Sequence, residues 1–370
     1  MELYVERKGE MLRRGLTTGT CAAAAAKAAT ISISTGESVD KVAVELPIGE
    51  SVELEIYDVQ REGDKCSCYT LKDAGDDPDV TNGAEVWAEV EFRTELGVVV
   101  DGGEGVGVVT KPGLQVPVGN AAINPVPKEM ITKEVEKVLP PGMGASVRIT
   151  VPKGSELAKR TMNPKLGIKD GISILGTTGV VEPKSVEAFK DSLVPQINVA
   201  LALGHEEVIL TPGRRSEKMA VGKGIPQDAV VQTGNFVGFM LKACVSMGVK
   251  RVLLFGSLGK LSKLALGYFY THSKESPKGT EAMAKHASLV GAGEDVAARV
   301  GRANTTEEAL AILRENGLSD IINHIADEVA SRSVEHVDGS LEVGTVLLSM
   351  DGEIVGRSNV GDSSWGRYLS

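Results

Sequence analysis

The alternation of short apolar runs with helical stretches after residue 164 is the feature that most constrains the fold. The runs lie at residues 172–175, 208–210, 229–232 and 251–255. Each run is followed by a segment with a helical pattern, and this order is typical of βαβ units around a parallel sheet. We therefore expect residues 164–370 to form an α/β domain, Rossmann-like, with a mostly parallel sheet. A hairpin with its turn at Asp351-Gly352 is expected to close it.

Residues 1–163 have a different pattern, which predicts an α+β domain. The tract "TCAAAAAKAAT" is rich in the best helix former, and Thr18 or Thr20 is expected to cap the helix that it forms. Strand-like alternations follow, at residues 42–46, 52–59, 66–71 and 84–92. A chain of 370 residues suits two domains of this kind.

Composition narrows the classes of function. The net charge of −10 argues against nucleic acid as a partner, because nucleic-acid binders usually have a basic face. No apolar stretch reaches the roughly 18 residues that suggest a membrane span. The charged start of the chain has no apolar signal core, so we expect a cytoplasmic protein without a membrane partner.

The cysteines do not form a disulfide framework in a chain of this size. Cys66-x-Cys68 has the spacing of half a metal site, but no second pair stands at ligand spacing, and the five histidines are scattered. Reduced thiols and no protein-bound metal are the expectation.

Several predicted strand ends carry small polar residues and cations. The stretch "GISILGTTGVVEP" places Gly176, Thr177, Thr178 and Gly179 directly after an apolar run, and we interpret it as the loop after the first strand of the second domain. Gly234, Asn235 and Gly256 stand at two later strand ends, and the cations nearby are Arg214, Arg215, Lys218, Lys260 and Lys263. Ligands of open α/β sheets bind at such ends, so the pattern indicates a nucleotide-like or carboxylate ligand. The alternative is a set of ordinary turns with solvated charges.

Two further stretches are candidates in the first domain. "GLTTGTCAAAAAKAA" has the small polar residues of an anion-binding loop of the sugar-kinase type, or else is a well-capped buried helix. "KDAGDDPDVTNG" concentrates Asp73, Asp76, Asp77 and Asp79. Crowded carboxylates raise one another's pKa, which favours a proton acceptor; a divalent-cation site and a solvated acidic turn are the alternatives.

Six motifs run in order from residue 13 to about 273: "RRGLTTGTCAAAAAKAA", "LKDAGDDPDVTNGA", "GEGVGVVTKPGLQVPVGNAAINPVP", "TMNPKLGIKDGISILGTTGVVEP", "GNFVG" and "GKLSKLALG…THS". In these motifs the chain resembles the CbiD family, the cobalt-precorrin-5B C1-methyltransferases of anaerobic cobalamin biosynthesis. The resemblance implies a two-domain enzyme, S-adenosylmethionine as methyl donor and a cobalt-containing corrinoid precursor as acceptor.

Four positions depart from the family pattern. Gly is usual near Asp170, Met where Lys184 stands, and Asn in the place of Arg214. An acidic residue is usual in the place of Phe239, where it would bind a ribose hydroxyl or the methionine amino group. This last departure weakens any donor-binding role for that helix face.

Under this resemblance, chemistry assigns roles to the candidate residues. Asp73 and Asp76 are predicted to take up a proton or balance positive charge on the acceptor. The donor is predicted to contact Gly176, Thr177, Thr178, Gly179, Gly234, Asn235 and Gly256. A macrocycle with many carboxylates needs cations and hydroxyls, and the candidates are Arg13, Arg14, Thr17, Thr18, Lys111, Arg214, Arg215, Lys260 and Lys263. The cobalt belongs to the substrate. A non-catalytic corrinoid-binding protein and a small-molecule kinase-like enzyme stay as alternatives, and the oligomeric state stays open.

Overall fold

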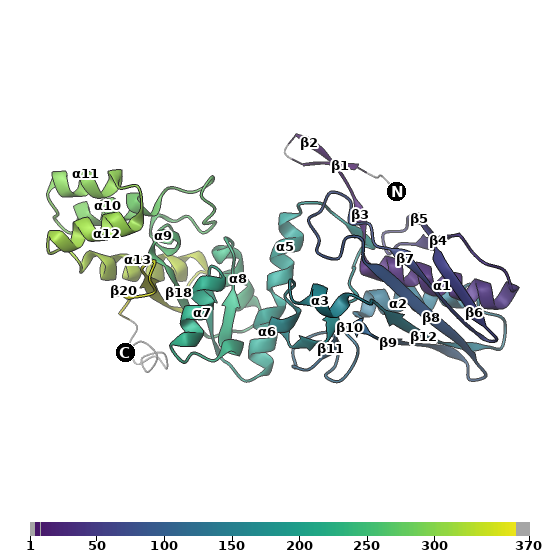
Figure 1. Cartoon of the computed structure of the whole chain (residues 1–370). Coiled ribbons are helices and arrows are strands. Elements are labelled where there is room, and N and C mark those ends of the chain that lie inside the picture. Colours follow the sequence, from purple (N-terminus) through teal and green to yellow (C-terminus); the bar gives the residue numbers. More distant parts are fainter. Residues whose placement is uncertain (1–3, 8, 360–370) are drawn as a thin grey trace. The chain divides into compact units, whose positions relative to one another are not determined.

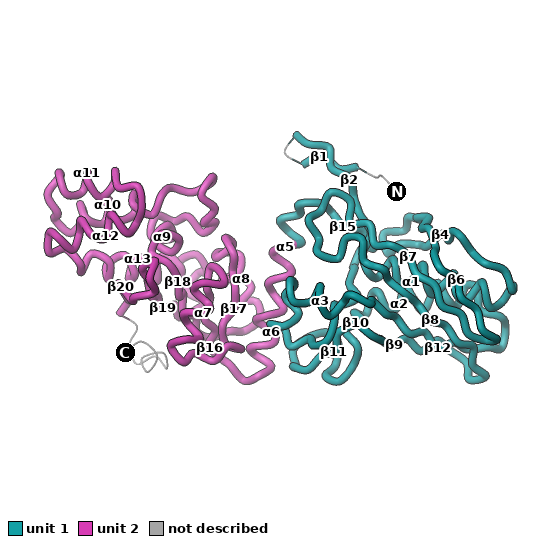
Figure 2. The backbone as a smooth tube through the Cα atoms, in the orientation of Figure 1, with its two compact units in different colours: residues 1–188 teal, residues 189–370 magenta. Residues whose placement is uncertain are grey.

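The computed structural model describes residues 4–7 and 9–359, which form two compact units, residues 1–188 (unit 1) and 189–370 (unit 2). Figure 2 shows them in two colours. The division falls at 188/189 rather than at the predicted 163/164. The reason is that residues 164–188 pair with strands from the first part of the chain, as described below.

Unit 1 is built around a five-stranded sheet in the order β6-β7-β8-β12-β9. Its strands are β6 (Tyr57–Glu62), β7 (Lys65–Leu71), β8 (Glu85–Arg93), β9 (Gly97–Gly102) and β12 (Gly144–Thr150). Helices α1 (Thr18–Thr35) and α2 (Pro125–Glu136) pack together on this sheet (Figure 1). The alanines of α1 are fully buried in the shared core, because small side chains let the helix approach the sheet closely. The cap of α1 is Thr17, one residue before the predicted Thr18, and its hydroxyl accepts from the amide of Thr20 at 3.2 Å.

Short strands complete unit 1. They are β1 (Tyr4–Arg7), β2 (Glu10–Arg13), β3 (Gly15–Leu16), β4 (Lys41–Glu45), β5 (Ser51–Glu55), β10 (Gly105–Val106), β11 (Val108–Val109), β13 (Ile168–Lys169), β14 (Gly171–Ile172) and β15 (Val180–Val181). Two short helices, α3 (Gly154–Ala158) and α4 (Asn163–Leu166), precede β13. The pairs β10–β14, β11–β13 and β3–β15 join residues 168–181 to unit 1.

The interpretation of residues 172–175 as the first strand of the second domain is therefore wrong. Ile172 ends β14, which pairs in parallel with β10, and Ile174 bridges Ile123; all of these residues belong to unit 1. The loop 176–179 that follows lies in unit 1 as well.

Unit 2 contains a mixed five-stranded sheet in the order β17-β16-β18-β19-β20. Its strands are β16 (Glu207–Thr211), β17 (Val230–Gln232), β18 (Arg251–Ser257), β19 (Glu342–Leu348) and β20 (Ile354–Arg357). The first four strands in this order run parallel, and β20 pairs antiparallel with β19 as the predicted closing hairpin. The strand order reverses direction between β16 and β18, which is where ligands bind in open α/β sheets.

Helices cover both faces of this sheet (Figure 1). The helices of this part of the chain are α5 (Val186–Leu193), which crosses the unit boundary, α6 (Pro195–Ala202), α7 (Arg214–Gly222), α8 (Val237–Ser246), α9 (Leu258–Leu261), α10 (Gly279–Leu289), α11 (Glu294–Arg302), α12 (Thr306–Glu315) and α13 (Ile321–His336), with 3-10 turns η1 (Gln227–Ala229) and η2 (Leu264–Leu266). Alternate residues of β16 face opposite cores: Leu210 packs with α6 and α8, and Ile209 packs with Ala220 of α7. The helical pattern expected after residues 251–255 is wrong for residues 260–270: the single turns α9 and η2 form there, and Gly267 ends η2 at φ +84°.

Candidate functional site

A cavity of about 370 Å³ opens in unit 2 at the carboxyl ends of three parallel strands. We call it the basic pocket; its lining is Pro212, Gly213, Arg214, Arg215, Ser216, Met219, Ser257, Lys260, Leu348, Ser349 and Met350. Residues 212–219 follow β16, Ser257 ends β18, Lys260 lies in α9, and residues 348–350 end and follow β19. The pocket therefore lies at the point where the strand order reverses, and its volume is in the range of small-molecule sites.

Among the residues that the structure describes, three cations and no carboxylate line the basic pocket. Arg214 and Arg215 are exposed, and the guanidinium of Arg215 donates to the carbonyl of Met350. Lys260 is half-buried; burial lowers its pKa, and its Nζ donates to Oδ1 of Asn235 at 3.0 Å. A concave site with one sign of charge attracts anions strongly, and the partial burial of Lys260 strengthens this field.

Lys263 does not line the basic pocket. It is buried, and its Nζ donates to the carbonyl of Thr271 at 3.2 Å and to the hydroxyl of Ser276 at 2.9 Å. Burial lowers its pKa, and the neighbouring Lys260 adds to this. In this arrangement Lys263 holds the 271–276 loop and, unlike Arg214, Arg215 and Lys260, does not line the pocket.

The donor-binding residues predicted in unit 2 are occupied by internal contacts. Oδ1 of Asn235 accepts from Lys260 and, at 3.4 Å, from the hydroxyl of Thr271. A Cβ on Gly256 would lie 2.6 Å from Cδ of Pro212, so this glycine is required by packing between two strand ends. Gly234 has a φ of +57° in the turn before Asn235.

The four other predicted donor residues form a loop against the start of α1. A Cβ on Gly176, where φ is +137°, would lie 2.2 Å from Oγ1 of Thr17. A Cβ on Gly179 would lie 2.8 Å from Leu46. Thr177 and Thr178 are exposed, and the hydroxyl of Thr178 bonds to the backbone of Val180. The two glycines of "GTTG" thus serve the packing of this loop.

Thr17 and Thr18, predicted to bind substrate, are buried and bonded to this loop. The hydroxyl of Thr18 accepts from the amide of Leu175 at 2.8 Å. The amide of Thr17 donates to the carbonyl of Gly179 at 3.1 Å. The two Thr/Gly motifs of the sequence are therefore each other's structural partners.

The acidic loop after β7 is organised by cations. Arg13 pairs with both carboxylate oxygens of Asp73, at 2.7 Å for the longer contact, and its amide donates to Asp76 at 2.6 Å. Buried Lys72 pairs with Asp79 at 2.7 Å. The hydrogen bonds from Arg13 lower the pKa of Asp73, so the expectation that crowded carboxylates raise it is wrong. The catalytic roles of Asp73 and Asp76 stay predictions.

The remaining predicted substrate residues also lie in unit 1. Nε of Arg14 forms a salt bridge with Glu182 at 2.7 Å, and Arg7 contacts the same carboxylate at 3.4 Å. Lys111 is half-buried, and its side chain packs against Gly167, where a Cβ would lie 2.3 Å from Cγ of the lysine. These cations stabilise unit 1 internally, in contrast to Arg214 of the basic pocket.

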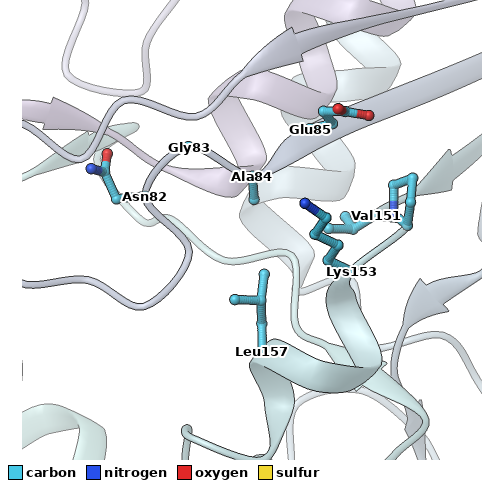
Figure 3. Close-up of a pocket in the computed structure, with 8 residues that line it drawn as sticks. Asn82, Gly83, Ala84, Glu85, Val151, Lys153 and Leu157 are labelled. Carbon is cyan, nitrogen blue, oxygen red and sulfur yellow. The ribbon is translucent and has the colours of Figure 1, made fainter.

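A second cavity, of about 210 Å³, lies in unit 1 between the turn before β8 and the start of α3 (Figure 3). Asn82, Glu85, Lys153 and Leu157 surround it, and it contains none of the predicted site residues. With one lysine and one carboxylate it has no dominant charge, so it does not match a polyanionic ligand.

The four cysteines are buried free thiols. Burial raises the pKa of Cys21, Cys68 and Cys244 to about 12 and also raises that of Cys66. Among residues 4–7 and 9–359, no group of three or more His, Cys, Asp or Glu is arranged to hold a metal ion. Within the same residues, no helix has both the length and the apolar character to cross a bilayer.

Sequence reasoning missed Ser257, Ser349 and Met350 as parts of the pocket. Residues 342–348 were expected only as one arm of a hairpin, so the carboxyl end of β19 was not considered beside those of β16 and β18. The apolar run "VGTVLL" is buried throughout, as in a central parallel strand, and this signal could have placed it there.

The fold defines a protein of two units, an α+β unit followed by a unit with a mixed, mostly parallel sheet, and the second unit has a cavity lined by three cations. Two family models match the chain, one in each unit. The CbiD family model matches residues 5–183, and the model described as CbiD, C-terminal domain, matches residues 270–359. The chain belongs to the CbiD family.

Similar proteins include chains from Alkaliphilus metalliredigens (45% identity; 95% of this chain and 93% of the relative), Moorella thermoacetica (47%; 95% and 96%) and Methanocaldococcus jannaschii (43%; 92% and 95%). Each of these relatives is named cobalt-precorrin-5B C(1)-methyltransferase. The crystal structure of a cobalamin biosynthesis protein (cbiD) from Archaeoglobus fulgidus shares 33% identity with a TM-score of 0.38, covering 71% of this chain and 83% of that one.

Proposed function

We propose that this chain methylates ring carbon C1 of cobalt-precorrin-5B, a cobalt-containing corrinoid precursor, in anaerobic cobalamin biosynthesis, with S-adenosylmethionine as the methyl donor. The support for the reaction is the identity of 43–47% with relatives of that name over 92–95% of the chain. In this proposal the chain is a C-methyltransferase and the corrinoid is its anionic small-molecule partner.

The basic pocket is the observation that supports a binding site for the corrinoid in unit 2. The acceptor is a macrocycle with many acetate and propionate carboxylates, and Arg214, Arg215 and Lys260 converge on one cavity without an acid among its lining residues. Guanidinium groups bind carboxylates in bidentate fashion, and a half-buried ammonium adds a less screened charge. A cavity of 370 Å³ is too small for a whole macrocycle with its side chains, so the pocket holds carboxylate arms at one edge.

The donor supplies a methyl group on a sulfonium, and the task of the chain is to align sulfur, methyl and C1 and to exclude water. Orientation of this kind contributes about 7–11 kcal/mol to the lowering of a barrier. Of the residues predicted from the sequence to bind the donor, Gly234, Asn235 and Gly256 lie in unit 2 and are the donor-binding residues of the proposal. The loop 176–179 belongs to unit 1, and its donor-binding role stays a prediction. An ionised Asp73 fits the balancing of positive charge on the acceptor better than the uptake of a proton, because its pKa is lowered.

The test is methyl transfer by the purified full-length chain. Cobalt-precorrin-5B is incubated without oxygen with S-adenosylmethionine that carries an isotopic label in its methyl group, and the corrinoid product is analysed by mass spectrometry. The proposal predicts one labelled methyl group per corrinoid and an equal amount of S-adenosylhomocysteine. Tight corrinoid binding without any transfer would instead identify a non-catalytic carrier.

A further inference from the structure

Four side chains of unit 2 form a continuous row of rings. Phe189, Phe236, Tyr270 and His272, which we call the aromatic row, have successive ring centroids 5.8, 5.0 and 5.9 Å apart. They come from α5, the turn before α8 and the loop after η2. Phe189, at one end of the row, is 50% exposed, and the other three rings are partly exposed.

Strand pairing does not account for this row. The chain has a second set of stacked rings, Tyr57, Tyr69 and Trp87 in unit 1, whose members are register partners on neighbouring strands. The aromatic row lies on helix and loop segments instead. Phe236 also packs against the hydrophobic core of unit 2. Only 4% of the residues are aromatic and this core is filled mainly with aliphatic side chains, so the half-exposed Phe189 at the end of the row indicates a use in addition to folding.

The aromatic row and the basic pocket are joined by one residue. Asn235, directly before Phe236, bonds through its side chain to Lys260 of the pocket. The carbonyl of Asn235 accepts from the amide of Thr271 at 2.9 Å, and Thr271 stands between the row members Tyr270 and His272. Asn235 thus links the segments that carry the rings to Lys260 of the pocket within unit 2.

The charges beside the row match a polyanion. Nζ of Lys190 lies 5.4 Å from the ring centroid of Phe236 and 5.7 Å from that of Phe239. In contrast, the rings of unit 1 donate to carboxylates, Tyr57 to Glu55 and Trp87 to Glu85. A flat, conjugated molecule with carboxylates at its edge meets both features of this surface.

We propose that the aromatic row is the platform for the conjugated ring of the cobalt corrinoid, whose carboxylate arms enter the basic pocket. This inference rests on the proposed function, because that function supplies the macrocycle. The rings provide contact area with the apolar ring system, and the cations fix its rotation on the platform.

The experiment uses two probes that share one macrocycle: dicyanocobyrinic acid, with free carboxylates, and its fully methyl-esterified form. Binding to the full-length protein is followed through the visible absorption and circular dichroism of the corrinoid. The variants are Phe189→Leu, at the exposed end of the row, and Tyr270→Leu. Tyr57→Leu, in the stacked rings of unit 1, is the matched control, and thermal melting checks that each variant is folded.

Each variant of the row is expected to weaken both probes by about threefold to tenfold, the usual scale for a lost aromatic contact. The Arg214→Ala/Arg215→Ala variant should weaken only the free acid, and Tyr57→Leu should weaken neither. Affinities of the row variants within twofold of the parent, or an equal loss in Tyr57→Leu, would overturn the platform while leaving methyl transfer by the parent protein intact. A parent protein that binds neither probe and transfers no methyl group would overturn the proposed function together with the platform.

Discussion

Nζ of Lys260 lies 3.0 Å from Oδ1 of Asn235, and within residues 4–7 and 9–359 no acidic side chain lines the pocket that this ammonium shares with two arginines. The partner of the buried end of Lys260 is a neutral amide, so its positive charge is not cancelled locally. A carboxylate in the place of the amide would cancel it. Replacement of Asn235 by the nearly isosteric Asp therefore changes the charge beside Lys260 with little change in shape.

Asn235→Asp should weaken binding of dicyanocobyrinic acid by roughly tenfold, because the new carboxylate pairs with Lys260 and repels the carboxylates of the ligand. The methyl-esterified corrinoid should bind within about twofold of its affinity for the parent. Titration of both probes at one ionic strength provides the measurement. Equal weakening of the two would indicate a damaged fold rather than a lost charge.

The buried carboxylate of Glu134 supplies a prediction about stability. It lies 2.6 Å from Nζ of both Lys27 and Lys137. Although burial alone would raise its pKa, the hydrogen bonds from the two lysines lower it below the ordinary 4.5. Glu134→Gln should reduce the free energy of unfolding at pH 7 by about 2–3 kcal/mol, because Lys27 is left largely buried without its charged partner.

The pH dependence of this effect follows from the sign of the shift. A carboxyl group with a lowered pKa stabilises the native state fully above its unfolded pKa, and this stabilisation is lost as the pH falls through the native value. The difference between the parent and Glu134→Gln should therefore be largest near neutral pH and shrink below about pH 4. Glu129→Gln, in an exposed pair with Lys133 on the same helix, should cost no more than about 0.5 kcal/mol. Urea titrations from pH 3 to 7 measure both, and a constant difference across this range would contradict the assignment.

Asp73→Asn tests the acidic loop. Because Arg13 holds the carboxyl ionised, the group is a poor proton acceptor near neutral pH, and single-turnover methylation should slow by less than tenfold. The pH profile of the rate should keep its shape. A loss of about 100-fold with unchanged binding of both substrates would restore the catalytic role predicted from the sequence.

The contact between Gly176 and Thr17 predicts a structural cost. Gly176→Ala places a methyl group against Oγ1 of Thr17 at a positive φ, so the melting temperature of the protein should fall markedly. Gly142→Ala has a positive φ of +81° but open space around its Cβ, so it measures the backbone strain alone. Equal melting temperatures for the two variants would show that the loop 176–179 yields easily and is free to serve a ligand.

Local patterns predicted much of the secondary structure. The alternation in residues 66–71 and 84–92 corresponds to β7 and β8, and the Ala-rich tract is the buried helix α1. The grouping of the units could not be predicted in the same way. Strands of two residues, such as β13 and β14, have no periodicity, and their partners lie more than 50 residues away in the chain.

The candidate site shows the same division between local and long-range information. Arg214, Arg215 and Lys260 could be predicted because each stands at the end of a strand with a clear pattern. The ion pair of Asp73 with Arg13 and the hydrogen bond of Thr18 with Leu175 could not be predicted. Both join residues that are more than 50 positions apart in the chain. The aromatic row had no sequence signal, because its members are spread over residues 189–272 without a common spacing.

The central claim is that the basic pocket holds the carboxylates of the corrinoid. Isothermal titration of the Arg214→Ala/Arg215→Ala variant with dicyanocobyrinic acid, and separately with S-adenosylhomocysteine, tests it most directly. Each exposed arginine is expected to contribute about 1 kcal/mol to the binding of carboxylates. The affinity of the variant for the corrinoid should therefore fall roughly ten- to thirtyfold, and its affinity for the donor analogue should be nearly unchanged. Unchanged corrinoid affinity, or an equal loss for both ligands, would contradict the claim.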